Sequence, residues 1–425
     1  MLLLIFVACN TKSDPSNVIT DDIDRFWDAY DLITQESDSV TQIRILDSVY
    51  IQPGTVGLRK IMEVRDYSAS EYVQLINQYP LFWKAIRENT LKSKRIANEL
   101  NDGINKLKQL YPELRPASIY FTIGCMRTNG TTQDSLVLIG SELAMADSLI
   151  DISEFEGGTK DWLETYFSTN PINGLVLLNV HEYVHTQQQP YFDQLLYKVL
   201  YEGVAEFVSV LAMDQPSLAP AIEFGKNNPK VREKFEEEMF YERAYEWIWS
   251  SYPNEFGVRD LGYYIGYAIA ERHYNQASDK QKAIRELIEL DYSNTALVDG
   301  FIDQTGFFTK SISQLRKEDQ SRRPSVGEIK EFKNRDTSVD PNLKEMTVVF
   351  SEQLNGYNTG VNYSDMGEEA FPEITGVTWS SDSMSCTFQL GLQPDKTYKF
   401  WITSNFRTKE GIPINPYLVQ FKTNN

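Results

Sequence analysis

The chain has 425 residues, more than one typical domain holds, which predicts two or three domains. Hydrophobic residues make up 41% of it, which excludes a chain that is disordered throughout. The formal net charge of -19 repels nucleic-acid phosphates, so the composition argues against a nucleic-acid partner. Three cysteines are too few for a disulfide framework, and we expect Cys125 and Cys386 to be small buried residues.

The chain opens with a short apolar run that ends at Cys9. A helix needs about 20 residues to cross a bilayer, so this run is too short to span one. Ala8-Cys9 resembles the end of a bacterial lipoprotein signal, in which a small residue precedes the cysteine that becomes lipidated. We therefore expect residues 1–21 to be a signal remnant and polar tether, with Cys9 lipidated and the protein extracytoplasmic, anchored to the outer membrane. The alternative is a buried N-terminal strand.

The next segments alternate between helical and strand patterns. Residues 22–115 repeat apolar side chains at helical spacing. Residues 117–124 and 135–140 have the β-branched and aromatic content of strands, with a turn at Asn129-Gly130 between them. The helical pattern returns over residues 160–305. We expect a helix-rich domain over residues 22–310, followed by a change of architecture.

Residues 311–336 are rich in Lys, Arg, Ser and Asp, which predicts a linker with helical fragments. Short strand patterns separated by turn residues follow, and they predict an all-β sandwich over residues 337–425. The predicted fold class is thus α+β, with helices and sandwich in separate domains. The expected strands are 346–350, 376–380, 384–390, 398–403 and 418–423.

Two of the three histidines lie four positions apart, in His181-Glu-Tyr-Val-His185. On a helix such residues face the same way, with β-carbons about 6 Å apart, so both imidazoles can bind one Zn²⁺. Glu182 then lies beside the metal, where it can act as the general base toward a water whose pKa zinc has lowered. The motif therefore predicts a catalytic zinc site.

The residues before the motif predict the helix that this geometry needs. Asn170-Pro171 offers an N-cap followed by proline in the first turn, and residues 175–180 are largely apolar. A buried helix that ends in His, Glu and His must pair these polar groups, because unpaired polar groups are costly to bury. Metal binding supplies the partner. The alternative is a pair of hydrogen-bonded core histidines.

Zinc needs a third protein ligand, and we expect it in the next helix. Glu202 and Glu206 are four apart on a helix that is otherwise apolar. We assign Glu202 to the metal and Glu206 to a position behind it, accepting a hydrogen bond from a ligand histidine. Gly203 costs a helix about 1 kcal/mol relative to alanine, which a close approach of two helices would explain. The alternative is that both glutamates are solvated.

The two motifs together resemble those of the gluzincin metallopeptidases. The segment 202–206, Glu-Gly-Val-Ala-Glu, is similar to the second motif of that clan, which supplies a glutamate ligand. The segment 262–267, Gly-Tyr-Tyr-Ile-Gly-Tyr, is similar to one in bacterial predicted zinc proteases. The resemblance covers about residues 115–300 and implies a mostly helical, zincin-like peptidase domain that acts on peptide or protein substrates.

The chain departs from the clan at two points. Only 16 residues separate His185 from Glu202, and Tyr201 stands where thermolysin-like members have Asn. These departures concern the subfamily rather than the ligands. No motif for a free amino terminus is present, which favours an endopeptidase.

The resemblance implies two further roles. The clan binds substrate as an added strand along a sheet edge, for which residues 119–123 or 136–139 are the candidates. It also uses a Tyr or His to stabilise the oxyanion, and we place Tyr264 and Tyr267 in the catalytic set. The candidates for the oxyanion role are Tyr263, Tyr264, Tyr267 and His273.

The C-terminal strands resemble bacterial immunoglobulin-like domains, through Asp340-Pro341 and the tyrosine-bearing turn at 392–398. This implies a spacer, or a module that binds a protein or glycan partner. The sequence therefore predicts a membrane-anchored, extracytoplasmic zinc peptidase. One alternative is a catalytically inactive zincin-fold lipoprotein that acts as a binding module, and another is a structural zinc site in a non-enzyme.

Overall fold

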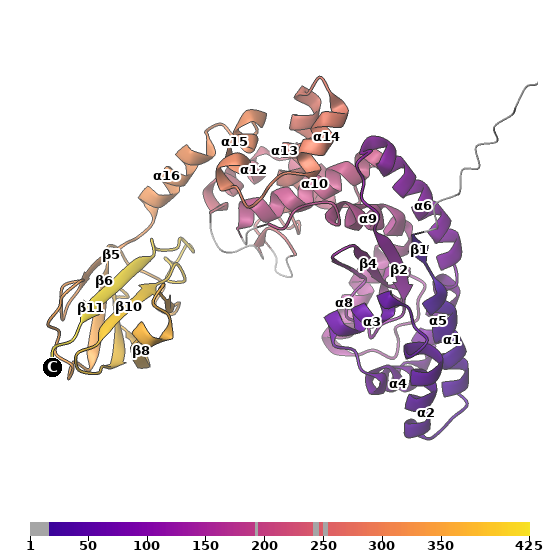
Figure 1. Cartoon of the computed structure of the whole chain (residues 1–425), viewed down its shortest axis with the longest axis horizontal. Helices are drawn as coiled ribbons and strands as arrows, with labels where there is room; N and C mark the ends of the chain where they lie inside the picture. Colours follow the sequence, from indigo (N-terminus) through magenta and orange to yellow (C-terminus); the bar gives the residue numbers. More distant parts are fainter. Residues whose placement is uncertain (1–16, 192–193, 241–245, 250–253) are drawn as a thin grey trace, which may run out of the picture. The chain divides into compact units, whose positions relative to one another are not determined.

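The computed structural model describes residues 17–191, 194–240, 246–249 and 254–425. About 48% of the chain is helix and 15% is strand, in small sheets, so the predicted α+β class is confirmed. The chain divides into two compact units (Figure 1). Unit 1 comprises residues 1–231 and 245–307, and unit 2 comprises residues 232–244 and 308–425.

Helices dominate the described part of unit 1. Many begin at a residue whose side chain caps the helix: Asp38, Ser68 and Asp279 each accept a hydrogen bond from a first-turn backbone N–H. The helices are α1 (Asp21–Ile33), α2 (Ser39–Leu46), α3 (Val56–Arg65), α4 (Ala69–Gln78), α5 (Pro80–Thr90), α6 (Ser93–Leu110), α7 (Ser141–Ala144), α8 (Gly157–Ser168), α9 (Pro171–His185), α10 (Leu195–Met213), α11 (Pro220–Asn227), α13 (Gly262–Gln276), α14 (Lys280–Ile288) and α15 (Thr295–Thr305). A π-helical turn, η1 (Asp47–Ile51), follows α2, and α12 (Pro229–Glu238) crosses the boundary between the units.

A four-stranded sheet in unit 1 has the order β1-β2-β4-β3. Strands β2 (Ser118–Thr122) and β4 (Leu136–Gly140) are parallel neighbours at its centre. Strand β3 (Gly130–Gln133) was expected only as a turn, yet it pairs antiparallel with β4 and forms one edge. Strand β1 (Val18–Ile19) lies inside the expected tether and pairs parallel with β2. The strands expected at the edge are therefore internal, because both have neighbours on either side.

Helices α10 and α13 cross at two glycines. A β-carbon on Gly203 would fall well under 3.0 Å from backbone atoms of Gly266 and Tyr267. A β-carbon on Gly266 would lie 2.7 Å from the carbonyl carbon of Val199 and 2.9 Å from the α-carbon of Gly203. The close helix approach expected at Gly203 is thus confirmed, and it brings α13 against the helix that carries Glu202.

Two sheets in unit 2 enclose one hydrophobic core. Their strand orders are β5-β6-β9-β8 and β11-β10-β7, and buried side chains from both, such as Phe388 and Phe400, belong to the same cluster. The range 311–336 holds a helix and a strand of the first sheet. The elements are α16 (Ile312–Arg322), β5 (Val326–Ile329), β6 (Glu345–Phe350), β7 (Val361–Tyr363), η3 (Glu368–Ala370), β8 (Glu373–Trp379), β9 (Ser385–Gly391), β10 (Thr397–Ile402) and β11 (Tyr417–Lys422).

The structure also bears on the cysteines and on membrane spans. Cys125 and Cys386 are free and buried, as expected. Cys9, the predicted lipidation site, lies outside the described residues. Among the described helices, none combines the length and apolar character needed to cross a membrane.

Candidate metal centre

Helix α9 positions His181, Glu182 and His185. Asn170 is its N-cap, in the left-handed conformation with φ 52°, and its side chain accepts a hydrogen bond from Ser148 N–H rather than capping the helix. Pro171 starts the helix as predicted. Val180 is fully buried and His181 is 3% exposed, whereas Leu178 is 38% exposed, so the histidine pair lies at the buried end of a helix that is exposed on one side.

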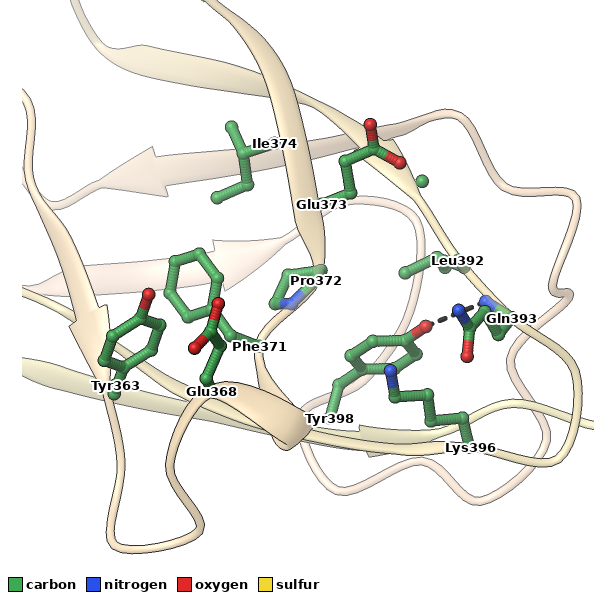
Figure 2. A pocket seen from close by; sticks show the side chains of 11 residues that line it. Tyr363, Glu368, Phe371, Pro372, Glu373, Ile374, Leu392, Gln393, Lys396 and Tyr398 are labelled. Carbon is green, nitrogen blue, oxygen red and sulfur yellow. Dashed lines mark hydrogen bonds between the residues drawn. The ribbon is translucent and has the colours of Figure 1, made fainter.

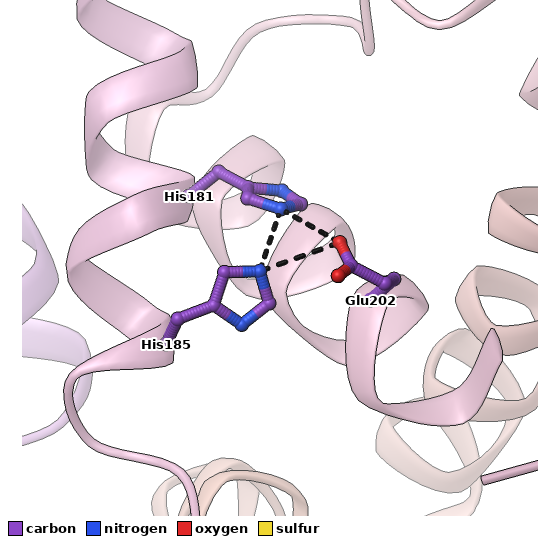
Figure 3. A group of neighbouring side chains, drawn as sticks. All are labelled: His181, His185 and Glu202. Carbon is purple, nitrogen blue, oxygen red and sulfur yellow. Dashed lines mark hydrogen bonds and ion pairs between the residues drawn. The ribbon is translucent and has the colours of Figure 1, made fainter. Parts of the chain in front are cut away.

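Three ligand-type atoms converge between α9 and α10 (Figure 3). The Nε2 atoms of His181 and His185 are 3.0 Å apart. One oxygen of Glu202, Oε2, lies 3.4 Å from the first Nε2 and 3.3 Å from the second. Two imidazole nitrogens and a carboxylate oxygen at such separations form a cluster that can hold a metal ion. The residues predicted as ligands are thus brought together.

Glu206 lies behind His181. Its Oε2 is 3.0 Å from Nδ1 of His181, and its Oε1 accepts a hydrogen bond from the Ser217 hydroxyl. With Nδ1 donating to Glu206, the Nε2 of the same ring faces Glu202 and His185, where a metal ion can take the place of its proton. Glu206 therefore lies where the sequence placed it, one turn beyond Glu202 on α10.

Gln188 takes the corresponding position behind His185. Its side-chain oxygen is 2.7 Å from Nδ1 of His185, and its Nε2 donates a 2.9 Å hydrogen bond to the Tyr201 carbonyl. The side chain is buried, at 7% exposed, so it joins the end of α9 to α10. Sequence reasoning missed Gln188. Its only signal was its place three residues after His185, close enough to turn back onto that ring.

Tyr201, the residue just before Glu202, makes an aromatic contact with His185. Its ring stacks on the ring of His185, with centroids 4.5 Å apart and an interplanar angle of 7°. Burial, followed by the charge of Glu202, raises the pKa of Tyr201. The hydroxyl therefore stays neutral at physiological pH, and the residue restrains the His185 ring by packing.

The charges of the cluster are strongly coupled. Burial opposes protonation of His181, but the hydrogen bonds that its ring donates to Glu202 and Glu206 outweigh burial and raise the pKa of His181 to about 10. Burial likewise opposes ionisation of Glu202, but His185 and His181 hold its pKa well below its usual range. Two ionised carboxylates against one imidazolium leave a net negative charge, so a metal cation can take the place of the proton on His181.

Glu182 lies beside the cluster and faces the sheet. Its Oε2 accepts a 2.6 Å hydrogen bond from the Thr132 hydroxyl, on edge strand β3. The sheet edge next to α9 is thus β3, and not the segments 119–123 or 136–139 that the sequence favoured. The short strand was missed because four polar or small residues after an Asn-Gly pair predict a turn.

The tyrosine of α13 that meets the cluster is Tyr263. Its ring centroid is 6.2 Å from that of His181, and burial, then the charge of Glu202, raise its pKa well above the ordinary value. Tyr264 and Tyr267, the residues preferred from the sequence, lie elsewhere: Tyr264 packs against Gly225 and Phe307, and Tyr267 against Phe207 and Lys226. His273, another candidate, pairs with Glu286 of α14 at 3.0 Å.

Comparison with known proteins does not assign the chain to a family. No protein-family model matches the chain, and no curated protein matches it significantly in sequence. Among solved structures, the S-layer protein rSbsC(31-844) matches at 12% identity and a TM-score of 0.18, over 63% of this chain and 38% of that one. Domains 1-6 of the surface layer protein SbsC match at 13% identity and a TM-score of 0.19, over 63% of this chain and 38% of that one. The N-terminal part of SbsC matches at 12% identity and a TM-score of 0.18, over 95% of this chain and 71% of that one. The chain thus spans well under half the length of the first two S-layer structures, and TM-scores this low support no conclusion about fold or function.

Proposed function

We propose that unit 1 is a zinc-dependent peptidase with a zincin-like fold. The observation that carries this proposal is the convergence of His181, His185 and Glu202. Zinc bonds of about 2.0–2.1 Å in a tetrahedron separate the ligand atoms by roughly 3.3 Å. The three atoms lie 3.0, 3.4 and 3.3 Å apart, so the donor set fits zinc without rearrangement. Three protein ligands leave a fourth position for water, as in catalytic rather than structural zinc sites.

Glu182 is the proposed general base. When bound, zinc would lower the pKa of water and polarise the scissile carbonyl. The Glu182 carboxylate takes the proton from the attacking water and delivers it to the leaving amine. Glu206 holds the Nδ1 proton of His181, and Gln188 holds that of His185, so both rings keep Nε2 free for the metal.

The substrate backbone is proposed to pair with strand β3, the sheet edge beside α9. Pairing along an edge recognises the peptide backbone rather than its side chains. This mode of binding agrees with an endopeptidase, because backbone pairing needs no free terminus on the substrate. Tyr263, which contacts His181, is the proposed oxyanion donor, since burial keeps its hydroxyl protonated.

The test is zinc content and peptide hydrolysis in wild type and in Glu182→Gln. The variant should bind one zinc per chain and lose about 99% or more of its turnover, because the base contributes at least about 10²-fold. Glu164→Gln, an exposed glutamate on α8, is the control and should match wild type. Full activity of Glu182→Gln would refute the mechanism.

The remaining sequence predictions stay part of the proposal. We propose that Cys9 is lipidated and anchors the chain to the outer membrane, with the peptidase on an extracytoplasmic face. Unit 2 is proposed to be an immunoglobulin-like sandwich. Metabolic labelling with a lipid precursor, compared between wild type and Cys9→Ser, tests the anchor; label retained in the variant would exclude it.

A second candidate function is a binding protein whose zinc site does not turn over. It is favoured by a cavity of about 490 Å³ in unit 2, within the size range of ligand sites (Figure 2). Aromatic rings and charged groups line it, among them Tyr363, Phe371, Glu368, Lys396 and Tyr398. Stoichiometric zinc without cleavage of a broad peptide library, together with glycan or protein binding lost in Tyr363→Ala, would favour this function over the first.

A further inference from the structure

Thr132 reaches Glu182 from a strand 50 positions earlier in the chain. Its hydroxyl donates to Oε2 of Glu182 at 2.6 Å, and the contact is partly buried. Among the described residues, Oε1 of Glu182 has no hydrogen-bond partner. One carboxylate oxygen of Glu182 is therefore held by the sheet, and among the same residues the other oxygen is not.

The register of β3 shows where the backbone of Thr132 points. In an antiparallel pair, residues alternate between those that hydrogen-bond the neighbouring strand and those whose N–H and C=O point away from it. The N–H of Gly140 donates to the Asn129 carbonyl at 3.2 Å, so Asn129 and every second residue after it bond to β4. Thr131 is in this set, while Thr132, opposite Val137, presents its N–H and C=O to the open edge.

Gly130 lies two residues before Thr132 on β3, so its backbone N–H and C=O point to the same side, and its contacts confirm this direction. Its N–H and C=O turn away from β4 and meet the side chain of Thr128, at 3.2 and 2.7 Å. The outward groups of Gly130 are thus occupied within the chain. Among the residues that the structure describes, none bonds the outward N–H and C=O of Thr132, which lie beside the base.

We propose that Thr132 is a positioning residue that couples substrate docking to the orientation of Glu182. This inference rests on the proposed peptidase function. A peptide that pairs with the edge fixes the backbone of Thr132, and the β-branched side chain then has little χ1 freedom. The hydroxyl therefore holds Glu182 in one orientation while the scissile bond is in place, which lowers the entropy cost of the proton transfer.

The test uses Thr132→Val, which keeps the shape and the backbone groups but removes the hydroxyl. We expect kcat to fall about tenfold or more, because the base is no longer oriented, and KM to stay within about twofold, because edge pairing is retained. Thr132→Ser restores the hydroxyl and should recover most of kcat. Thr295→Val, at an exposed threonine that begins α15, is the control and should keep wild-type values.

The outcomes separate this inference from the proposed function. Zinc content is measured in every variant and should equal that of wild type. A wild-type enzyme that cleaves peptides, with unchanged kcat in Thr132→Val, overturns the coupling alone. So does a rise in KM with constant kcat, which would give Thr132 a binding role only. A zinc-loaded wild type that cleaves nothing overturns the peptidase function and this inference with it.

Discussion

The glycine crossing of α10 and α13 offers a sharp test of how the metal centre is held. In Gly203→Ala the new β-carbon would meet backbone atoms of Gly266 and Tyr267 well inside 3.0 Å. Helix backbone cannot rotate aside as a side chain does, so the helices must separate by about 1 Å to restore ordinary contact. Glu202 is the neighbouring residue, and a shift of this size moves its carboxylate away from the histidine pair.

The expected change in the unfolding free energy of Gly203→Ala follows from two opposing effects. Overpacking costs about 1–3 kcal/mol, and the better helix propensity of alanine offsets about 1 kcal/mol of it, so the variant should lose up to about 2 kcal/mol of unfolding free energy. Displacement of a ligand by about 1 Å should lower kcat/KM by about 100-fold. Chemical denaturation measures the loss of stability and peptide cleavage the loss of kcat/KM. Competition with a chelator measures zinc affinity, which should fall because Glu202 is displaced.

Gly300 provides the matched control. It lies on α15, and a β-carbon there would have nothing within 4 Å. Gly300→Ala should therefore stabilise the chain by about 1 kcal/mol through helix propensity and leave zinc affinity unchanged. If Gly203→Ala kept wild-type stability and zinc affinity, the crossing would not hold the centre and the reasoning would be wrong.

Three further predictions concern groups around and away from the cluster. Glu206→Gln weakens the partner of His181 Nδ1 and should reduce zinc affinity about 10- to 100-fold in chelator competition; unchanged affinity would remove its orienting role. Gln188→Leu leaves Nδ1 of His185 unpaired, so zinc affinity should fall about tenfold or more in chelator competition. Wild-type zinc affinity in this variant would contradict the role of Gln188. Glu142 is fully buried, and burial raises its pKa from 4.5 to about 7, so its contribution to stability is complete below pH 4.5 and is lost as pH rises through 7. Between pH 4.5 and 7 the unfolding free energy should fall by roughly 3 kcal/mol in wild type and by less in Glu142→Gln. The same pH dependence in both proteins would show that Glu142 is not the group responsible.

Several features were predictable because they depend on neighbours along the chain. His181 and His185 share a helix face through their spacing of four, and Pro171 starts that helix. Glu202 and Glu206 follow by the same rule on α10, and Gly203 indicated a close crossing before its partner was known. Local periodicity was enough for these residues because helix geometry is repeated at every turn.

Other features were not predictable from local patterns. Which tyrosine of α13 meets the cluster depends on how that helix is rotated at the Gly203–Gly266 crossing, and the rotation selects Tyr263. The edge strand depends on pairing between distant segments, which placed β3 outside β4 although its residues predict a turn.

The sequence by itself determined the donor atoms of the candidate metal site and the α+β class, since both follow from residue type and period. Only the tertiary structure decided what surrounds those donors. Gln188 behind His185, Thr132 on Glu182 and Tyr263 against His181 all join segments that local spacing does not relate. The physical reason is that side-chain hydrogen bonds act within about 3 Å, so small changes in strand order or helix rotation select different partners.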